Sequence, residues 1–226
     1  KKYIQRFKKK EKIDYLFLPH KKLEHLFKKK IQAHYIYSGF LKNNEIKFKK
    51  KNKKKYDLMI ISEFRRNIEQ NKLKKINFAF NVLSKISRKY NYKICVAFVS
   101  KRADKFKKVN YNEEKNYFDK FFFKYSISKL DAYTLSNNSK IIFSMNSNLG
   151  YELLSRGQKV IFISNGQKFY LKQYPFVCKI QDLEKNILKL IKMRKFWSDK
   201  YFINQKCINF DPDNKVLKNY LQKDLY

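Results

Sequence analysis

The segment IIFSMNSNLGYELLSRGQKVIFIS, residues 141–164, decides the fold of this chain. Two apolar runs enclose a short polar turn, a stretch with helical character and a glycine. It holds two of the four glycines of the chain and one lysine, although lysine dominates elsewhere. Strand, turn, helix, glycine and strand, in that order, form a compact βαβ unit, which predicts two parallel strands.

The turn between the first strand and the helix is made of residue types that begin helices. Ser and Asn accept hydrogen bonds from the first helical amides, so Asn146, Ser147 and Asn148 predict a helix starting near Leu149. Gly157 suits the left-handed position that ends a helix. Gly150, in the first turn, is expected to let a ligand approach the backbone closely.

Further apolar runs alternate with helical patterns on both sides of this segment. We predict parallel strands at 57–62, 93–99, 140–145 and 159–164, with helices between them. One predicted helix, within 67–90, carries Ile76, Phe80, Leu83 and Ile86 on one face. The expected fold class is α/β, a Rossmann-like parallel sheet with helices on both faces.

The expected organisation has three parts. Residues 46–55 are almost free of residues that can be buried and predict a basic linker. Residues 56–226 would form the Rossmann-like domain, and residues 1–45 the tail of a preceding domain. The chain begins Lys1-Lys2-Tyr3 without a methionine, so we expect a piece of a longer polypeptide.

The composition restricts the class of protein. Lys and Arg number 54 against 19 Asp and Glu, a net charge of +35, while 43% of the residues are hydrophobic. The charge suggests nucleic acid or an anionic membrane as partner, but a bias toward A/T-rich codons explains the same lysines. Three distant cysteines exclude a disulfide framework, and no run approaches the ~18 apolar residues of a membrane span.

A candidate binding site follows from the predicted sheet, because ligands of such sheets bind beyond the carboxyl ends of the strands. There the free amides and positive dipole end of a helix attract phosphate. Arg65 and Arg66 follow the first strand, Ser100 and Lys101 the second, and Glu152 offers an acceptor for a ribose or sugar diol. The expected donor-binding residues are Ser144, Asn146, Ser147, Asn148, Leu149, Gly150, Glu152, Arg65, Arg66, Ser100 and Lys101.

Simpler explanations compete for the same residues. Any turn between a strand and a helix favours Ser, Asn and Gly, so the turn alone does not require phosphate. Glu113 and Glu114 begin a predicted helix and are interpreted as charges that favour its dipole. Phe118 and the run 121–123 are expected in the core rather than as a base-stacking platform.

The segment SMNSNLGYELLSRGQKVIFIS resembles the donor-site segment of bacterial surface-carbohydrate (O-antigen type) biosynthesis proteins with the GT-B glycosyltransferase fold. AHYIYSGFLKNN, LMIISEFRRN and INFDPDNKVLKNYL resemble that family in the same order along the chain. Asn148 departs from the pattern, which has a hydroxyl residue there. The resemblance implies a nucleotide-sugar held by residues 56–226 and an acceptor held by the preceding domain.

The function that the resemblance implies is glycosyl transfer from a nucleotide-sugar to a cell-surface polysaccharide or lipopolysaccharide precursor. We expect no cofactor beyond the donor substrate and no metal. The expected location is the cytoplasm, with the lysines in peripheral contact with the inner membrane face, near a glycan or lipid-linked acceptor. No catalytic residue is assigned.

Two alternatives stay open. A basic nucleic-acid-binding protein would explain the charge but not the βαβ turn. A polyol-phosphate transferase of the same fold would share every feature named above.

Overall fold

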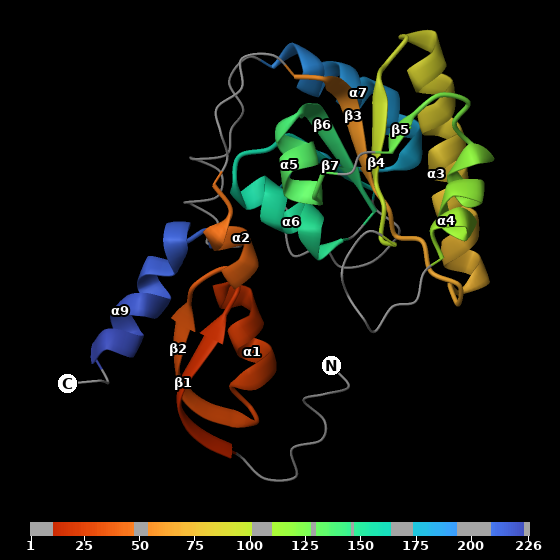
Figure 1. The fold of residues 1–226 in the computed structure, drawn as a ribbon. Coiled ribbons are helices and arrows are strands. Elements are labelled where there is room, and N and C mark those ends of the chain that lie inside the picture. The colour runs from red at the N-terminus through yellow and green to blue at the C-terminus, as the bar shows by residue number, and fades with distance from the viewer. Residues whose placement is uncertain are drawn as a thin grey trace. The chain divides into compact units, whose positions relative to one another are not determined.

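The computed structural model describes residues 11–47, 54–100, 110–127, 130–145, 147–163, 174–193 and 209–223 (Figure 1). The chain forms two compact units, one made of residues 1–47 and 197–226, the other of residues 48–196. The C-terminal segment thus differs from the prediction, which placed it in a domain of 56–226. The predicted linker, 46–55, lies mostly outside the described residues.

The second unit contains a six-stranded parallel sheet in the order β5-β4-β3-β6-β7-β8. Its strands are β3 (Tyr56–Ile61), β4 (Ile94–Ala97), β5 (Ser126–Ile127), β6 (Ser139–Ser144), β7 (Val160–Ile163) and β8 (Val177–Cys178). The four predicted strands and their parallel pairing are confirmed. The edge strands β5 and β8 were not predicted, because two residues are too few to show a periodic pattern.

Helices connect these strands and cover the sheet. They are α3 (Gln70–Lys89), α4 (Tyr111–Asp119), α5 (Ala132–Asn137), α6 (Asn148–Ser155) and α7 (Leu183–Lys192), with a 3₁₀ turn η3 (Ile180–Asp182) before α7. The hydroxyl of Ser84 on α3 donates to the carbonyl of Phe121 after α4, and Lys89 on α3 pairs with Glu184 on α7. Figure 1 shows α5 and α6 side by side in front of the sheet.

Both faces of the central strands are buried, as in a covered parallel sheet. Every residue from Leu58 to Ile61 is at most 1% exposed, and so is every residue of β7. On α3, the predicted face of Ile76, Phe80, Leu83 and Ile86 is buried, which confirms that helix. The free thiol of Cys95 is fully buried in β4, and burial raises its pKa to about 12.

An aromatic cluster fills the space between α3 and α4. The ring of Phe80 lies 5.3 Å from that of Phe118 and 5.6 Å from that of Phe121, centroid to centroid. The core prediction is confirmed for Phe118, Phe121 and Phe122. It is wrong for Phe123, which is 96% exposed.

The end of α6 shows why Gly157 is needed. Its φ is +80°, and its amide donates to the carbonyl of Leu154 while that of Gln158 donates to Leu153. This pair of hydrogen bonds is the Schellman motif, which needs a left-handed residue at its centre. The predicted helix stop is therefore confirmed.

The first unit is built on two parallel strands, β1 (Glu11–Leu18) and β2 (Ile31–Tyr37), joined by the 3₁₀ turn η2 (Lys21–Leu23) and α1 (Glu24–Phe27). The helix α2 (Leu41–Glu45), the 3₁₀ turn η4 (Pro212–Asn214) and α9 (Lys215–Lys223) complete the described part of the unit.

A buried polar network joins the C-terminal segment to this unit. The amide nitrogen of Asn44 donates to Ser38 O at 2.7 Å and to the Oδ1 of Asn214 at 2.8 Å, and its oxygen accepts from the amide of Asp211. At Gly39, with φ of +74°, an added Cβ would lie 2.5 Å from the carbonyl oxygen of Asn209. Long-range hydrogen bonds between side chains leave no periodic pattern in a sequence, so the predicted domain boundary missed them.

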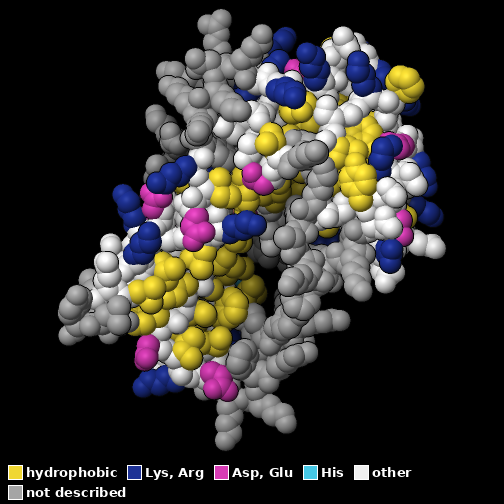
Figure 2. All heavy atoms as spheres, in the orientation of Figure 1, with side chains coloured by type: hydrophobic (Ala, Val, Ile, Leu, Met, Phe, Trp, Pro, Cys, Tyr) yellow, Lys and Arg dark blue, Asp and Glu magenta, His cyan; other side chains and the backbone are white. Residues whose placement is uncertain are grey.

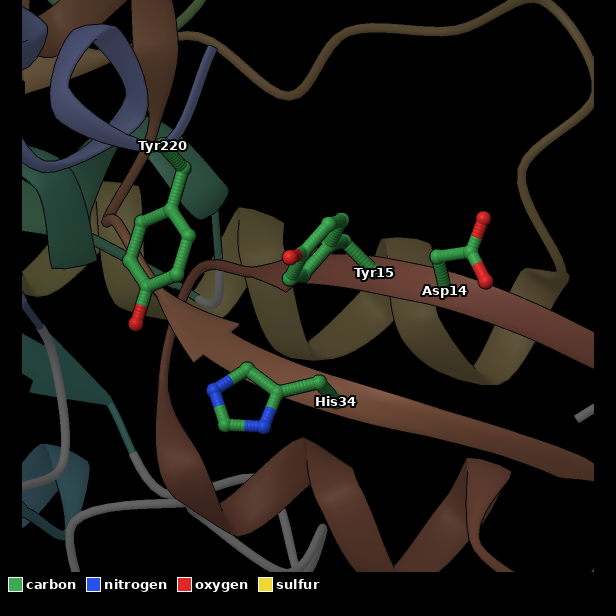
Figure 3. Close-up of a pocket in the computed structure, with 4 residues that line it drawn as sticks. All are labelled: Asp14, Tyr15, His34 and Tyr220. Carbon is green, nitrogen blue, oxygen red and sulfur yellow. The ribbon is translucent and has the colours of Figure 1, made fainter. Parts of the chain in front are cut away.

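Hydrophobic side chains remain at the surface of the first unit, over β1, β2 and α9 (Figure 2). Ile13 and Tyr15 on β1 and Leu221 on α9 are 40%, 38% and 53% exposed. A hollow there is lined by Asp14, Tyr15, His34 and Tyr220. The three rings face a common space, whereas the carboxylate of Asp14 points away from them (Figure 3).

Candidate functional site

The direction of the strand order reverses between β3 and β6. From β3 the chain continues outward to β4 and β5, then returns to β6 and continues in the opposite direction. Ligands of open α/β sheets bind at this reversal, beyond the carboxyl ends of the strands. Because Ile60 pairs with Phe143, the residues that follow β3 lie beside those that follow β6.

The start of α6 follows β6 at this reversal point, with Ser147 at the N-cap position. The buried Oγ of Ser144 accepts from the amide of Ser147 at 3.1 Å, which fixes the turn. The Ser147 side chain makes no capping hydrogen bond, and Asn148 is exposed. The first amides of a helix lack partners within it, so this end offers donors to an anion.

Gly150 has a different role from the one predicted. A Cβ on this residue would lie 2.6 Å from Ser144 Oγ and 2.9 Å from Cε1 of Phe162. A side chain at this position would therefore face the sheet, and its absence lets α6 pack closely on β6 and β7. The prediction that the glycine makes room for a ligand is corrected, and the neighbouring Leu149 is buried as well.

Glu152 lies one turn into α6, and its carboxylate accepts a hydrogen bond from the hydroxyl of Tyr133 on α5. The ring of Tyr133 is 8% exposed, so the donor is held in place by packing. Sequence reasoning missed this partner, because Tyr133 occurs in a short helix without a strong pattern.

The two arginines after β3 differ. Arg66 forms a bidentate pair with Glu113, with its Nε 2.8 Å and its Nη2 2.7 Å from the carboxylate oxygens. These bonds raise the pKa of Arg66 and lower that of Glu113. Arg65 is exposed to solvent.

Glu114 is not the helix-start charge that was predicted. It is fully buried, and its Oε1 accepts from the hydroxyl of Ser62 and from the amide of Val99 at 2.9 Å. Its Oε2 accepts from the amide of Ser100, also at 2.9 Å. The helix is capped instead by Asn110, which accepts from the amide of Asn112. A signal was available, because Glu114 shares a helix face with the buried Phe118 four residues later.

The remaining predicted site residues are placed only in part. The hydroxyl of Ser100 is buried and finds no hydrogen-bond partner among the residues described. Asn146 and Lys101 lie outside the described residues. In the part of the chain that the structure describes, no three His, Cys, Asp or Glu side chains could hold a metal ion together. Nor is any described helix long and apolar enough to span a membrane.

Known structures share this fold. A "putative UDP-N-acetylglucosamine 2-epimerase" from Listeria monocytogenes is similar with a TM-score of 0.54 at 13% identity, over 91% of this chain and 57% of that one. The UDP-GlcNAc 2-epimerase of Methanocaldococcus jannaschii, in complex with UDP-GlcNAc and UDP, gives 0.56 at 13% identity, over 93% and 61%. The GtfA/B complex gives 0.54 at 10% identity, over 94% and 46%. The chain therefore spans about half to three fifths of these proteins.

Sequence comparison gives the family. No curated protein matches the chain. Residues 2–179 match a protein family described as "putative O-antigen biosynthesis protein". Since this match spans most of the 226 residues, and the solved neighbours are glycosyltransferase and epimerase folds of the GT-B type, the chain belongs to this O-antigen biosynthesis family and has a Rossmann-like α/β fold.

Proposed function

We propose that this chain is the donor-binding part of a glycosyltransferase that moves a sugar from a nucleotide-sugar to a cell-surface polysaccharide or lipopolysaccharide precursor. The observation that carries the proposal is that α6 begins where the strand order of the sheet reverses, and that the side chain of Ser147 makes no capping hydrogen bond there. Membership of the O-antigen biosynthesis family supports the same class of chemistry.

In this proposal the diphosphate of the donor lies against the start of α6. The amides of Asn148 and Leu149, the hydroxyl of Ser147 and the positive end of the helix dipole stabilise its charge. As the bond to the sugar breaks, negative charge grows on the departing diphosphate, and donors already in position lower the barrier without reorganising.

Arg65 is the better candidate for the diphosphate cation. Both arginines are exposed, but Arg66 already forms a bidentate pair with Glu113, and no such pair holds Arg65 among the described residues. We therefore expect Arg65→Ala to weaken donor binding more than Arg66→Ala, and the two variants form a matched pair.

Glu152 is proposed to accept hydrogen bonds from ribose hydroxyls. The hydroxyl of Tyr133 fixes the direction of its carboxylate before a ligand arrives. Glu152→Gln should then weaken binding of the nucleoside part while leaving the affinity for inorganic diphosphate unchanged.

No metal is assigned to this chemistry. The acceptor would be a glycan or lipid-linked precursor, and we propose that the lysines hold the protein at the anionic inner face of the membrane. Basic residues contribute roughly 1 kcal/mol each near such a surface. Flotation with anionic and with neutral liposomes at low salt tests this, and equal recovery would contradict it.

Calorimetric titration of the full-length protein with UDP-GlcNAc, other nucleotide-sugars and free UDP tests the central proposal. Saturable binding that Ser147→Ala weakens several-fold supports it, because one neutral hydrogen bond contributes about 0.5–1.5 kcal/mol. Tight, salt-sensitive binding of nucleic acid with no response to nucleotide-sugars would favour a nucleic-acid-binding protein instead. Interconversion of UDP-sugars without an acceptor would identify an epimerase.

A further inference from the structure

A single buried carboxylate links the ends of two neighbouring strands at the candidate site. Glu114 reaches from α4 to Ser62, directly after β3, and to the amides of Val99 and Ser100, just after β4. We propose that Glu114 is a positioning residue that holds both loops in the conformation that binds the nucleotide-sugar. This inference rests on the proposed function.

The burial of Glu114 argues that its geometry is tightly specified. An ionised side chain is costly to remove from water unless hydrogen bonds replace the lost hydration. Here three donors on two loops supply them, and both carboxylate oxygens are used. Moving either loop would leave a buried donor or acceptor unpaired, so the carboxylate resists displacement of both loops.

The adjacent residue strengthens the same connection. Glu113 forms its bidentate pair with Arg66, which belongs to the loop after β3. The first turn of α4 is therefore attached to that loop twice, once by a buried bond and once by an exposed one. Exposed pairs contribute little to stability, so the buried carboxylate is the dominant anchor.

These contacts bear on residues expected to touch the donor. Ser62 lies three residues before Arg65, the proposed diphosphate cation, and the amide of Ser62 also donates to Ala97 O at 3.2 Å. Ser100, whose amide binds Glu114, carries the buried hydroxyl without a partner among the described residues. A ligand oxygen at this edge would give the Ser100 hydroxyl a hydrogen-bond partner, and Glu114 holds the backbone of Ser100 in place.

Glu114→Gln tests the proposal with almost no change in shape. The amide keeps one acceptor oxygen but turns the other position into a donor. Whichever way the group is oriented, its nitrogen meets the amide hydrogen of either Val99 or Ser100. We expect hydrogen exchange at these two amides to become faster, and the dissociation constant for UDP-GlcNAc to rise roughly tenfold or more.

Asn110→Ala is the matched control, because it weakens the same helix without removing any of the hydrogen bonds that the carboxylate of Glu114 accepts. It removes the 2.8 Å capping bond to the amide of Asn112 and should lower the thermal midpoint of the protein. Both variants are compared at a temperature where circular dichroism shows them folded. Unchanged affinity in Asn110→Ala beside weakened affinity in Glu114→Gln supports the positioning role, and equal weakening in both overturns it.

Other outcomes are also decisive. A Glu114→Gln protein that binds UDP-GlcNAc as tightly as the parent, with unchanged exchange at Val99 and Ser100, overturns the inference while the proposed function stands. A parent that binds no nucleotide-sugar overturns the proposed function, and the inference with it. If Glu114→Gln fails to fold, Ser62→Ala removes one of the three donors to Glu114, together with the acceptor of the Phe64 amide, and should weaken binding by a few-fold, whereas parent-like binding would contradict the proposal.

Discussion

Both units of the molecule are built on parallel strands, but the strands are covered to very different extents. In the second unit, β3 and β6 have neighbours on both sides and helices on both faces, and Met59, Ile60 and Ile142 are completely buried. In the first unit, β1 and β2 pair only with each other among the described strands. Ile13 and Tyr15 on β1 remain about two fifths exposed.

The two units also differ in the side-chain capping of their helices. In the second unit, Asn110 and Asp131 cap α4 and α5 with their side chains, whereas the residues before α3, α6 and α7 make no side-chain capping bond. In the first unit, the residues before η2, α1 and α2 make no side-chain capping bond. The deeper burial of its strands gives the second unit the rigid framework on which a ligand site needs to be built.

Hydrogen exchange should show the largest difference between the units. We expect the amides of β3 and β6 to exchange many-fold more slowly than those of β1 and β2, because opening a strand buried on both faces requires unfolding of the sheet. Mass spectrometry of peptides covering 56–61, 139–144, 11–18 and 31–37 measures this in one experiment. Comparable protection in both sets would break the comparison.

The next largest difference between the units is expected in the stability lost when one aromatic side chain of each is truncated. Phe80 is 1% exposed and contacts five other rings, including Phe118 and Phe143, so Phe80→Ala should cost about 3–5 kcal/mol. Tyr220 is half-buried, and Tyr220→Ala should cost about 1–2 kcal/mol. Urea titrations followed by far-ultraviolet circular dichroism test both, and equal losses would contradict the expectation.

Gly150→Val should destabilise the second unit by roughly 1–3 kcal/mol, since the new side chain would overlap Ser144 and Phe162. Gly150→Ala should cost less, because it adds one carbon instead of three. Thermal unfolding of the two variants beside the parent measures the order. A valine variant as stable as the parent would show that α6 can move away from the sheet. It would then contradict the packing role of Gly150 and favour the original prediction that this glycine makes room for a ligand.

The fold could be predicted because its signals are local and periodic. The strands β3, β4, β6 and β7 each contain a continuous apolar run, at 58–61, 94–97, 141–143 and 160–163, and Gly157 marks the end of α6. The candidate site was predicted less well. Ser147 and the arginines were placed by their position after a strand, but the pairing of Arg66 with Glu113 and of Glu152 with Tyr133 depends on how separate helices pack.

Glu114 shows most clearly why part of the site escaped prediction. Two acidic residues at the start of a helix favour its dipole, so Glu113 and Glu114 were given the same role. Adjacent residues on a helix point about 100° apart, and here one faces solvent while the other enters the sheet edge. The difference lies in the three donors from β3 and β4, which only the assembled sheet brings together.

The smallest expected effect concerns the cap of α5, and it carries a pH signature. Asp131 accepts from the amides of Tyr133 and Thr134 at 2.9 and 3.0 Å and from the hydroxyl of Thr134 at 2.6 Å. Burial acts to raise the pKa of this carboxyl, but the hydrogen bonds outweigh it, and the pKa lies below its usual value of 3.8. A lowered folded pKa means that the charged cap stabilises the protein above the unfolded value, and that this stability is lost as pH falls through the folded value.

Asp131→Ala should therefore cost about 1 kcal/mol at neutral pH. The difference from the parent should shrink as the solution is acidified below pH 4. Asp131→Asn is the matched control, because its amide oxygen can still cap the helix while it carries no titrating proton. Thermal midpoints of the three proteins across this range test the argument. If the difference in thermal midpoint between the parent and Asp131→Ala stays constant with pH, the carboxylate charge contributes nothing to the cap of α5. The two units would then differ less in helix capping than the structure indicates.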